Sequence, residues 1–306
     1  MALLETVLGL ALLVASALNL LSIIRLIKPV EHRQEREELV ADQTVETTPT
    51  ANNNPEPEAA PQQVPTTKSE ILAWRRRIIS EIEQERGSRV ITMIHKRELW
   101  TGPGEDPEIV LEDAETVLQQ IRRTPPDVPI DLILHTPGGM ALAAEMMSMA
   151  IKFHPENVTV IVPFYAMSGG SLMSLAADKI VMERYSMLGP VDPQIPTPDG
   201  NTWPAGSLET LVTLKPLQKV SDRMIVMADV ARLEIENATA FVMWLLEERM
   251  SKENAKRVAE FFAHGYMSHS TPITLDVVKA VGLDVEEGVP EKVYELFKTF
   301  GFVPAS

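Results

Sequence analysis

Residues 158–182 read VTVIVPFYAMSGGSLMSLAADKIVM, and this stretch decides the fold. An apolar, β-branched run breaks at Ser168, Gly169 and Gly170, and a segment of small apolar residues leads to a second apolar run, Lys179–Met182. The pattern predicts a buried strand, a tight turn with serine at its tip, a short helix and another strand. Such a turn can place a nucleophile beside an oxyanion site. By itself the pattern favours the plainer interpretation, in which Ser168 caps the helix.

Segments of strand and helix type alternate along the chain on both sides of this stretch. We expect strands at 89–95, 130–135, 158–164 and 179–182, and helices at 109–121, 139–153 and 169–178. Further helices are expected at 217–250, 252–263, 275–281 and 291–299, and a long ordered loop at 187–216. Strands separated by helices predict βαβ units, so the fold class is α/β with a mainly parallel sheet.

Composition excludes several classes of function. The 306 residues carry a net charge of −15, which argues against a nucleic-acid partner because phosphate binding needs a basic face. The chain has no cysteine, so disulfides, thiolate metal sites and cysteine nucleophiles are excluded. Its six histidines show no metal-ligand spacing. We therefore expect no metal and no cofactor.

The N-terminal region is expected to anchor the chain in a membrane. Residues 7–24 are uncharged and about long enough to cross the hydrocarbon core as a helix. The first positive charges, on Arg25, Lys28, Arg33 and Arg36, follow this run and predict that the remaining chain is cytoplasmic. We expect a single-pass transmembrane anchor at 1–30, a disordered linker at 31–68 and a catalytic domain at 69–306.

Two glycine-containing turns follow predicted strands. Pro137, Gly138 and Gly139 follow one strand, and Ser168 and Gly169 follow another. In an open α/β sheet, sites form beyond the carboxyl ends of the strands. If the turns are neighbours, the amides of Gly139 and Gly169 could form an oxyanion hole while Ser168 attacks. Taken alone, the first turn is also an ordinary strand-to-helix connection.

The paired turns resemble those of a known family. The sequence is similar to the Clp/crotonase-fold serine peptidases in the order of its motifs: a strand, PGG and a helix, then a strand followed by AMSGG, LAADKI and LGPV. Within these, the sequence looks like the serine dehydrogenase proteinases, related to signal peptide peptidase A and the NfeD-type membrane peptidases. The resemblance covers about residues 89–283. It implies a spiral of ββα units, oligomerisation, and hydrolysis of peptide bonds near a membrane.

The resemblance leaves the general base open. The Clp proteolytic subunit carries a histidine soon after its nucleophile, where this chain has Met187–Asp192 and no histidine. Signal peptide peptidase-like enzymes use a lysine instead, so Lys219, or else Lys215, is the candidate, with Ser221 orienting the amine. Lys219 equally fits an exposed lysine on a solvated helix. His269 is interpreted as a structural group, and Asp192 as a residue that fixes a turn.

The leading hypothesis is a membrane-anchored serine peptidase with a Ser168–Lys219 dyad. Its partners would be peptides or unfolded proteins, the membrane and further copies of the chain, with no nucleic acid. Two alternatives stay open. One is a catalytically inactive oligomeric scaffold at the membrane, and the other is a crotonase-type acyl-CoA enzyme, which shares the oxyanion turns.

Overall fold

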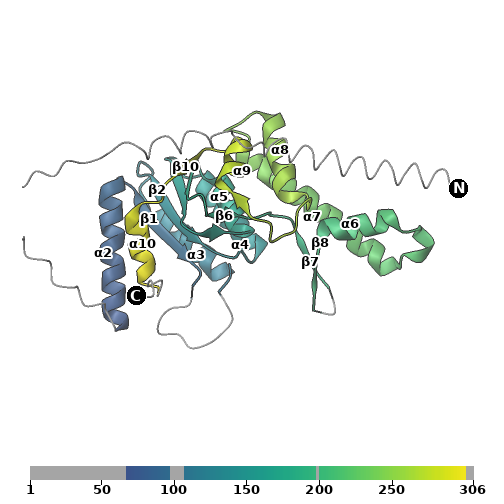
Figure 1. The fold of residues 1–306 in the computed structure, drawn as a ribbon, viewed down its shortest axis with the longest axis horizontal. Helices are drawn as coiled ribbons and strands as arrows, with labels where there is room; N and C mark the ends of the chain where they lie inside the picture. The colour runs from purple at the N-terminus through teal and green to yellow at the C-terminus, as the bar shows by residue number, and fades with distance from the viewer. Residues whose placement is uncertain (1–66, 97–106, 198–199, 301–306) are drawn as a thin grey trace, which may run out of the picture. The chain divides into compact units, whose positions relative to one another are not determined.

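A computed structural model of the chain describes residues 67–96, 107–197 and 200–300 (Figure 1). The chain divides into two units, residues 1–65 and 66–306. The expected anchor at 1–30 and nearly all of the expected linker at 31–68 lie outside the described residues. Within the described ranges, no helix combines the length and apolar character needed to cross a membrane.

A five-stranded parallel sheet forms the centre of the second unit. Its order is β1–β2–β3–β5–β10, and every neighbouring pair runs parallel. The strands are β1 (Arg89–Ile94), β2 (Ile130–His135), β3 (Val158–Val162), β5 (Lys179–Met182) and β10 (Val285–Glu287). Helices connect successive strands, so the predicted α/β class with a parallel sheet is confirmed. The short strand β10 was not predicted.

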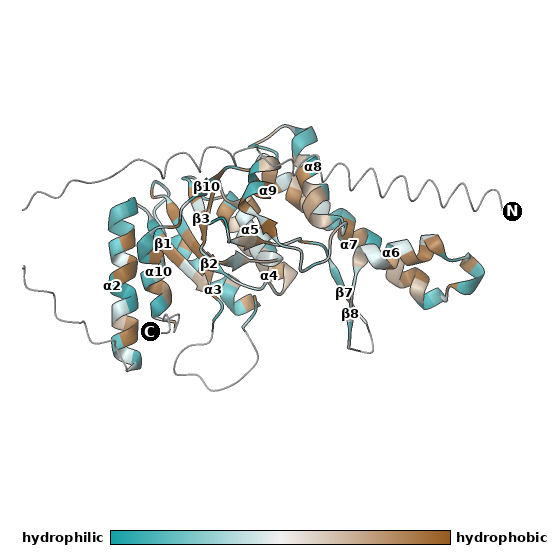
Figure 2. Cartoon of the chain, in the orientation of Figure 1, coloured by the Kyte–Doolittle hydropathy of each residue, from teal (hydrophilic) through white to brown (hydrophobic). Residues whose placement is uncertain are grey.

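Helices cover both faces of this sheet. One face packs against α3 (Leu111–Arg123), α4 (Ala141–Lys152), α5 (Gly169–Ala176) and α8 (Lys252–Ala263), and the other against α2 (Lys68–Arg86) and α10 (Glu291–Lys298). Successive strand residues alternate between the two cores: Val160 belongs to the first and Ile161 to the second. The apolar strands and helix faces appear brown in Figure 2. Both layers are buried, as expected for a parallel sheet.

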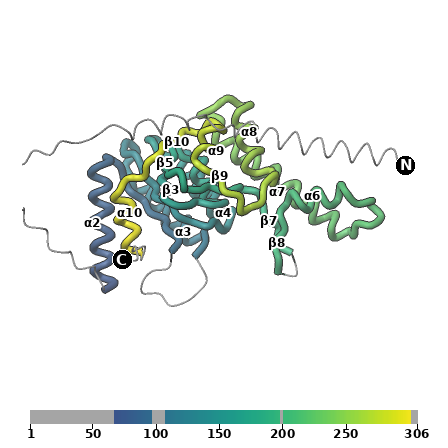
Figure 3. Tube along the Cα trace, viewed as in Figure 1, coloured from purple at the N-terminus to yellow at the C-terminus, as the bar shows by residue number. Residues whose placement is uncertain are grey.

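Helices α2 and α10 lie side by side although they stand at opposite ends of the described chain (Figure 3). Lys292 of α10 donates a hydrogen bond of 2.6 Å to Glu81 of α2. The first and last helices of the described chain, α2 and α10, therefore cover the same face of the sheet.

The predicted loop at 187–216 contains regular structure. It includes β6 (Met187–Leu188), the β7–β8 hairpin (Gln194–Pro196 and Thr202–Pro204) and helix α6 (Ala205–Leu214). Strand β6 joins a small sheet with β4 (Tyr165–Ala166) and β9 (Ile273–Thr274), and α9 (Leu275–Ala280) follows directly. The predicted helix at 217–250 is instead a short 3-10 turn, η1 (Leu217–Lys219), followed by α7 (Asp222–Leu246).

One buried ion pair joins α2 to the middle of the sheet. Arg86 donates two hydrogen bonds to Asp131, of 2.6 and 2.9 Å, and the Ser88 hydroxyl donates a third. The Asp131 side chain is only 3% exposed. A carboxylate this deeply buried depends on its partners, because an unpaired charge in the protein interior is strongly destabilising.

We expect Arg86→Met to lower the free energy of unfolding by about 3 kcal/mol, because it leaves the Asp131 carboxylate buried without its cation. Arg89→Met is the control, since the Arg89–Glu83 pair is partly exposed and should contribute less than about 1 kcal/mol. Urea unfolding of both variants measures the difference. Equal losses would show that the Asp131 pair is no more important than a surface pair.

Candidate active site

Ser168 lies at a strained turn between β4 and α5. Its backbone has φ 49° and ψ −114°, and it is the one described residue other than glycine with a positive φ. Such a conformation costs of order 1–3 kcal/mol and occurs mainly at functional sites. Ser168 occupies the N-cap position of α5, but its side chain makes no capping hydrogen bond. A capping role therefore does not account for this serine.

The two glycine-containing turns are neighbours. The Thr136 amide donates to the Tyr165 carbonyl at 3.2 Å, and the Met167 amide donates to the Thr136 carbonyl at 2.9 Å. These two bonds align the end of β2 with the segment that leads to Ser168. A Cβ placed on Gly138 would lie 2.7 Å from the Ser168 Cβ, so the first turn touches the serine directly.

Two amides in these turns have no acceptor among the described residues. The Gly138 amide donates to the Thr136 hydroxyl at 3.1 Å, but neither Gly139 nor Gly169 donates its amide to any described group. Gly169 is the first residue of α5, where amides lack an intrahelical acceptor. Gly139 and Gly169, the predicted oxyanion residues, thus each offer an N–H close to Ser168.

Close packing requires glycine in both turns. A Cβ on Gly139 would lie 2.4 Å from the Ile109 amide nitrogen, and one on Gly169 would lie 2.8 Å from the Ala144 Cβ. Gly139 also has a φ of 148°, which side chains rarely adopt. Contact with the segment before α3 and with α4 therefore sets the position of each turn.

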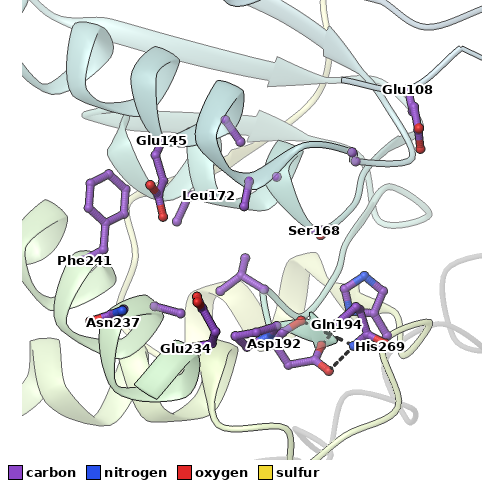
Figure 4. Close-up of a pocket in the computed structure, with 18 of the residues that line it drawn as sticks. Glu108, Glu145, Ser168, Leu172, Asp192, Gln194, Glu234, Asn237, Phe241 and His269 are labelled. Carbon is purple, nitrogen blue, oxygen red and sulfur yellow. Dashed lines mark hydrogen bonds and ion pairs between the residues drawn. The ribbon is translucent and has the colours of Figure 1, made fainter. Parts of the chain in front are cut away.

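A pocket of about 420 Å³ opens in front of Ser168 (Figure 4). The pocket is lined by the two turns, by helices α4, α5 and α7, and by the segments around residues 108, 192 and 269. Its polar lining residues are Ser168, Glu108, Glu145, Asp192, Gln194, Glu234, Asn237 and His269. Leu172, Val191 and Phe241 give it an apolar wall.

His269 and Asp192 form a hydrogen-bonded pair in this pocket (Figure 4). His269 Nδ1 lies 2.6 Å from Asp192 Oδ1. The side-chain amide of Gln194 donates through Nε2 to Asp192 Oδ2 at 2.7 Å. Asp192 is 3% exposed, whereas the His269 side chain is 36% exposed. With Nδ1 directed at the carboxylate, Nε2 remains to exchange a proton with a second group. The pair has the composition of the base and orienting acid of a serine peptidase.

Ser168, His269 and Asp192 all line the same pocket, with Ser168 on one wall and the pair on the other (Figure 4). Within the described chain, no hydrogen bond joins Ser168 to His269. The sequence interpretation placed Asp192 in a turn and His269 in a structural role, and neither residue was assigned to the catalytic set. The bracketing of Asp192 by Pro190 and Pro193 was the available signal that its backbone is held rigidly.

Lys219 and Lys215 lie away from this pocket in their own chain. Both are exposed and neither is among the residues that line it. Lys219 belongs to η1, in the turn that joins α6 to α7, at the end of that helical hairpin farthest from the central sheet (Figure 1). Ser221, which was expected to orient the lysine, instead accepts a hydrogen bond from the Met224 amide and caps α7.

The lining of the pocket is rich in acidic side chains. Glu108, Glu145, Asp192 and Glu234 contribute carboxylates, and none of the described lysines or arginines lines the pocket. Burial raises the pKa of Glu145, and the Glu234 carboxylate raises it further. A substrate segment rich in acidic side chains would be repelled by this lining.

A family model described as "ClpP-like SDH-type serine proteinase" matches residues 61–302. Two proteins of Methanocaldococcus jannaschii, both named as uncharacterized, are similar over 228 residues. MJ1495 is 44% identical, with 74% of this chain and 76% of the relative covered. MJ0137 is 43% identical, with 74% and 78% covered.

Solved structures with a related fold include two proteases. The 1510-N membrane-bound stomatin-specific protease, in complex with a substrate peptide, is 17% identical with a TM-score of 0.44, over 67% of this chain and 77% of that one. ClpP1 from Listeria monocytogenes is 16% identical with a TM-score of 0.40, over 68% and 97%.

Proposed function

The chain belongs to the ClpP-like serine proteinases of the SDH type and is a serine peptidase; from this premise, we propose that it cleaves peptide bonds through Ser168, His269 and Asp192. The observation that supports this assignment is the His269–Asp192 pair in the pocket that holds Ser168. It replaces Lys219 as our candidate for the base.

In the proposed reaction, Ser168 Oγ attacks the carbonyl carbon of the scissile peptide bond while His269 Nε2 takes the hydroxyl proton. The Asp192 carboxylate holds Nδ1–H and stabilises the imidazolium that forms. The amides of Gly139 and Gly169 donate to the oxyanion of the tetrahedral intermediate. His269 then protonates the leaving amine, and water hydrolyses the acyl-enzyme in a second round of the same steps. This reaction requires Ser168 Oγ and His269 Nε2 to come within hydrogen-bond distance when a substrate is bound.

A lysine base is the alternative mechanism. Lys219 could serve Ser168 only if another copy of the chain supplied it, or if the α6–α7 hairpin were rearranged, because it is exposed and remote from the pocket of its own chain. An exposed lysine is also poorly suited to act as a base at neutral pH, since its reference pKa is about 10.4 and burial is what lowers it.

Ser168→Ala should reduce hydrolysis of an unfolded protein substrate by at least about a thousandfold, because the acyl-enzyme can no longer form. The Ser168→Ala variant should also lose labelling by a fluorophosphonate probe. Ser174→Ala is the matched control: Ser174 is fully buried on the same helix and its hydroxyl donates to the Gly170 carbonyl, so its loss should leave labelling intact. Full activity in the Ser168→Ala variant would exclude this serine as the nucleophile.

His269→Ala should lower kcat by about a thousandfold, whereas Lys219→Ala should change it by less than about twofold. The reason is that His269 lines the pocket and Lys219 does not. Steady-state hydrolysis of a fluorogenic peptide by the two variants measures this directly. The opposite result, with Lys219→Ala inactive and His269→Ala active, would establish the lysine mechanism in place of the histidine one.

The substrates we propose are peptides or unfolded protein segments. An extended chain can enter an open cleft that a folded protein cannot, and the apolar wall of Leu172, Val191 and Phe241 offers a site for an apolar side chain. The carboxylates of the lining favour neutral or basic segments over acidic ones.

We propose that residues 1–30 anchor the peptidase in the cell membrane. The uncharged run at 7–24 supports a spanning helix, and the positive charges that follow it support a cytoplasmic catalytic domain. The linker at 31–68 would let that domain reach substrates near the membrane surface.

We also propose that the peptidase forms a homo-oligomer and that its fold follows the spiral of ββα units implied by the resemblance. Support comes from the α6–α7 hairpin, which exposes large apolar side chains: Leu214, Leu217, Val226, Val230 and Leu233. Apolar side chains gathered in this way on a surface mark a protein contact more often than they mark solvent.

Removal of residues 1–27 should move the protein from the membrane fraction to the soluble fraction of its host cell, because the spanning run is lost. The released protein should scatter light with a mass several times that of one chain. Cell fractionation and light scattering measure the two expectations separately. Retention at the membrane would contradict the anchor, and a monomeric mass would contradict the oligomer.

A further inference from the structure

We propose that His95 is a positioning residue, which acts through Thr136 to hold the turn carrying Gly139 in the geometry that peptide hydrolysis requires. The proposal rests on the proposed function of Ser168 and Gly139. Its basis is a closed circuit of hydrogen bonds and one electrostatic contact on the side of the turn away from the pocket.

The Thr136 hydroxyl connects His95 to the turn. His95 Nδ1 lies 2.8 Å from Thr136 Oγ1, and the Gly138 amide donates to the same oxygen at 3.1 Å. Thr136 is fully buried. The Gly138 amide belongs to the Pro137–Gly138 peptide plane, so this hydrogen bond orients that plane. The next plane is held by the Ile109 amide, which donates to the Gly138 carbonyl, and the Gly139 amide in it is left for the oxyanion.

The protons of this circuit can be assigned from the chemistry of the groups. The Thr136 hydroxyl accepts from the Gly138 amide and can donate its one proton to His95 Nδ1, provided that Nδ1 carries a lone pair. His95 Nε2 lies 3.3 Å from Asp113 Oδ2, a contact that is not a hydrogen bond but whose charge favours the N–H on Nε2. Burial lowers the pKa of His95 and so favours the neutral ring. The nearby carboxylates of Asp113 and Glu108 oppose this shift but are outweighed by burial.

Asp113 connects His95 to the segment that pairs with the other side of the turn. It accepts a hydrogen bond of 2.9 Å from the Val110 amide. The neighbouring Ile109 pairs with the turn twice: its amide donates to the Gly138 carbonyl, and its carbonyl accepts from the Met140 amide, both at 2.8 Å. The turn is therefore held by Thr136 on one side and by Ile109 on the other, and Asp113 and His95 join these two supports.

Neither His95 nor Thr136 can touch a substrate. The His95 side chain is 7% exposed, Thr136 is fully buried, and neither residue lines the pocket. The side-chain circuit reaches Ser168 through Gly138, which contacts that serine, whereas the backbone pairing of Thr136 with Tyr165 and Met167 does not involve the hydroxyl. A displaced turn would leave the Gly139 amide out of line with the oxyanion while the binding surfaces of α4 and α7 stayed in place.

The test compares Thr136→Val with Thr136→Ser in the full chain. Valine keeps the shape and removes the hydroxyl, whereas serine keeps the hydroxyl and removes the methyl. We expect Thr136→Val to lower kcat on a fluorogenic peptide by about tenfold to a hundredfold, less than the loss of a whole oxyanion donor, with KM changed by less than about twofold. Thr136→Ser should retain kcat to within about threefold.

His95→Leu provides a second, independent break in the same circuit. It should reproduce the loss of kcat seen in Thr136→Val, and the double variant should lose no more than either single variant, because all three remove one connection. If Thr136→Val fails to fold, by the criterion of its thermal unfolding midpoint, His95→Leu alone decides the question.

Amide hydrogen exchange of the peptide spanning the turn gives a readout that needs no turnover. We expect exchange at the Gly138 amide, which donates to the Thr136 hydroxyl, to accelerate in Thr136→Val and not in Thr136→Ser. Unchanged kcat in both Thr136→Val and His95→Leu, a loss confined to KM, or an equal loss in Thr136→Ser would each overturn the proposal.

The wild-type chain and Ser168→Ala separate this proposal from the function on which it rests. If wild-type hydrolysis depends on Ser168, the function stands and the Thr136 variants decide the role of His95. If wild-type hydrolysis does not depend on Ser168, the proposed function fails, and faster exchange in Thr136→Val then assigns the circuit a structural role only, which also overturns the positioning proposal.

Discussion

The whole site depends on the backbone pairing of Thr136 with the segment that carries Ser168. Two hydrogen bonds, to Tyr165 and from Met167, continue the sheet for one residue beyond β2 and bring the two glycine-containing turns into contact. Without this pairing, Ser168 and Gly169 would lie in one loop and Gly139 in a separate one. Because of it, the carboxyl ends of neighbouring parallel strands meet at one edge of the sheet and share one pocket.

Several elements of the central core were the most predictable part of the chain, whereas β4, which leads directly to Ser168, was not predicted. Strands β2 and β5 and helix α8 have the predicted bounds, and β3 begins at the predicted Val158. These segments are buried on both faces or carry a complete apolar face, so local hydrophobic pattern and structure agree. The turn at Ser168 was predictable for the same reason, since glycines interrupt an otherwise apolar run there.

The base that we propose was not predictable, because no local pattern contains it. Asp192 and His269 are 77 residues apart in sequence and meet only because their segments fold onto the same side of the pocket. The nature of Lys219 was equally hidden, since a lysine in sequence does not reveal whether its amine is buried. The predicted helix began at residue 217, but α7 begins only at Asp222. Pro216, the N-cap of η1, contributes to this late start, because proline fixes its own φ and restricts the residue before it.

The close packing around the turns distinguishes residues that the fold requires from residues that the chemistry requires. Gly138, Gly139 and Gly169 each occupy space that a single methyl group would take from a different neighbour: the serine, Ile109 or Ala144. A descendant that had lost catalysis would still need these glycines in order to pack its sheet edge. Their presence in a related sequence therefore indicates the fold, whereas retention of Ser168 together with the distant Asp192 and His269 would indicate selection for chemistry.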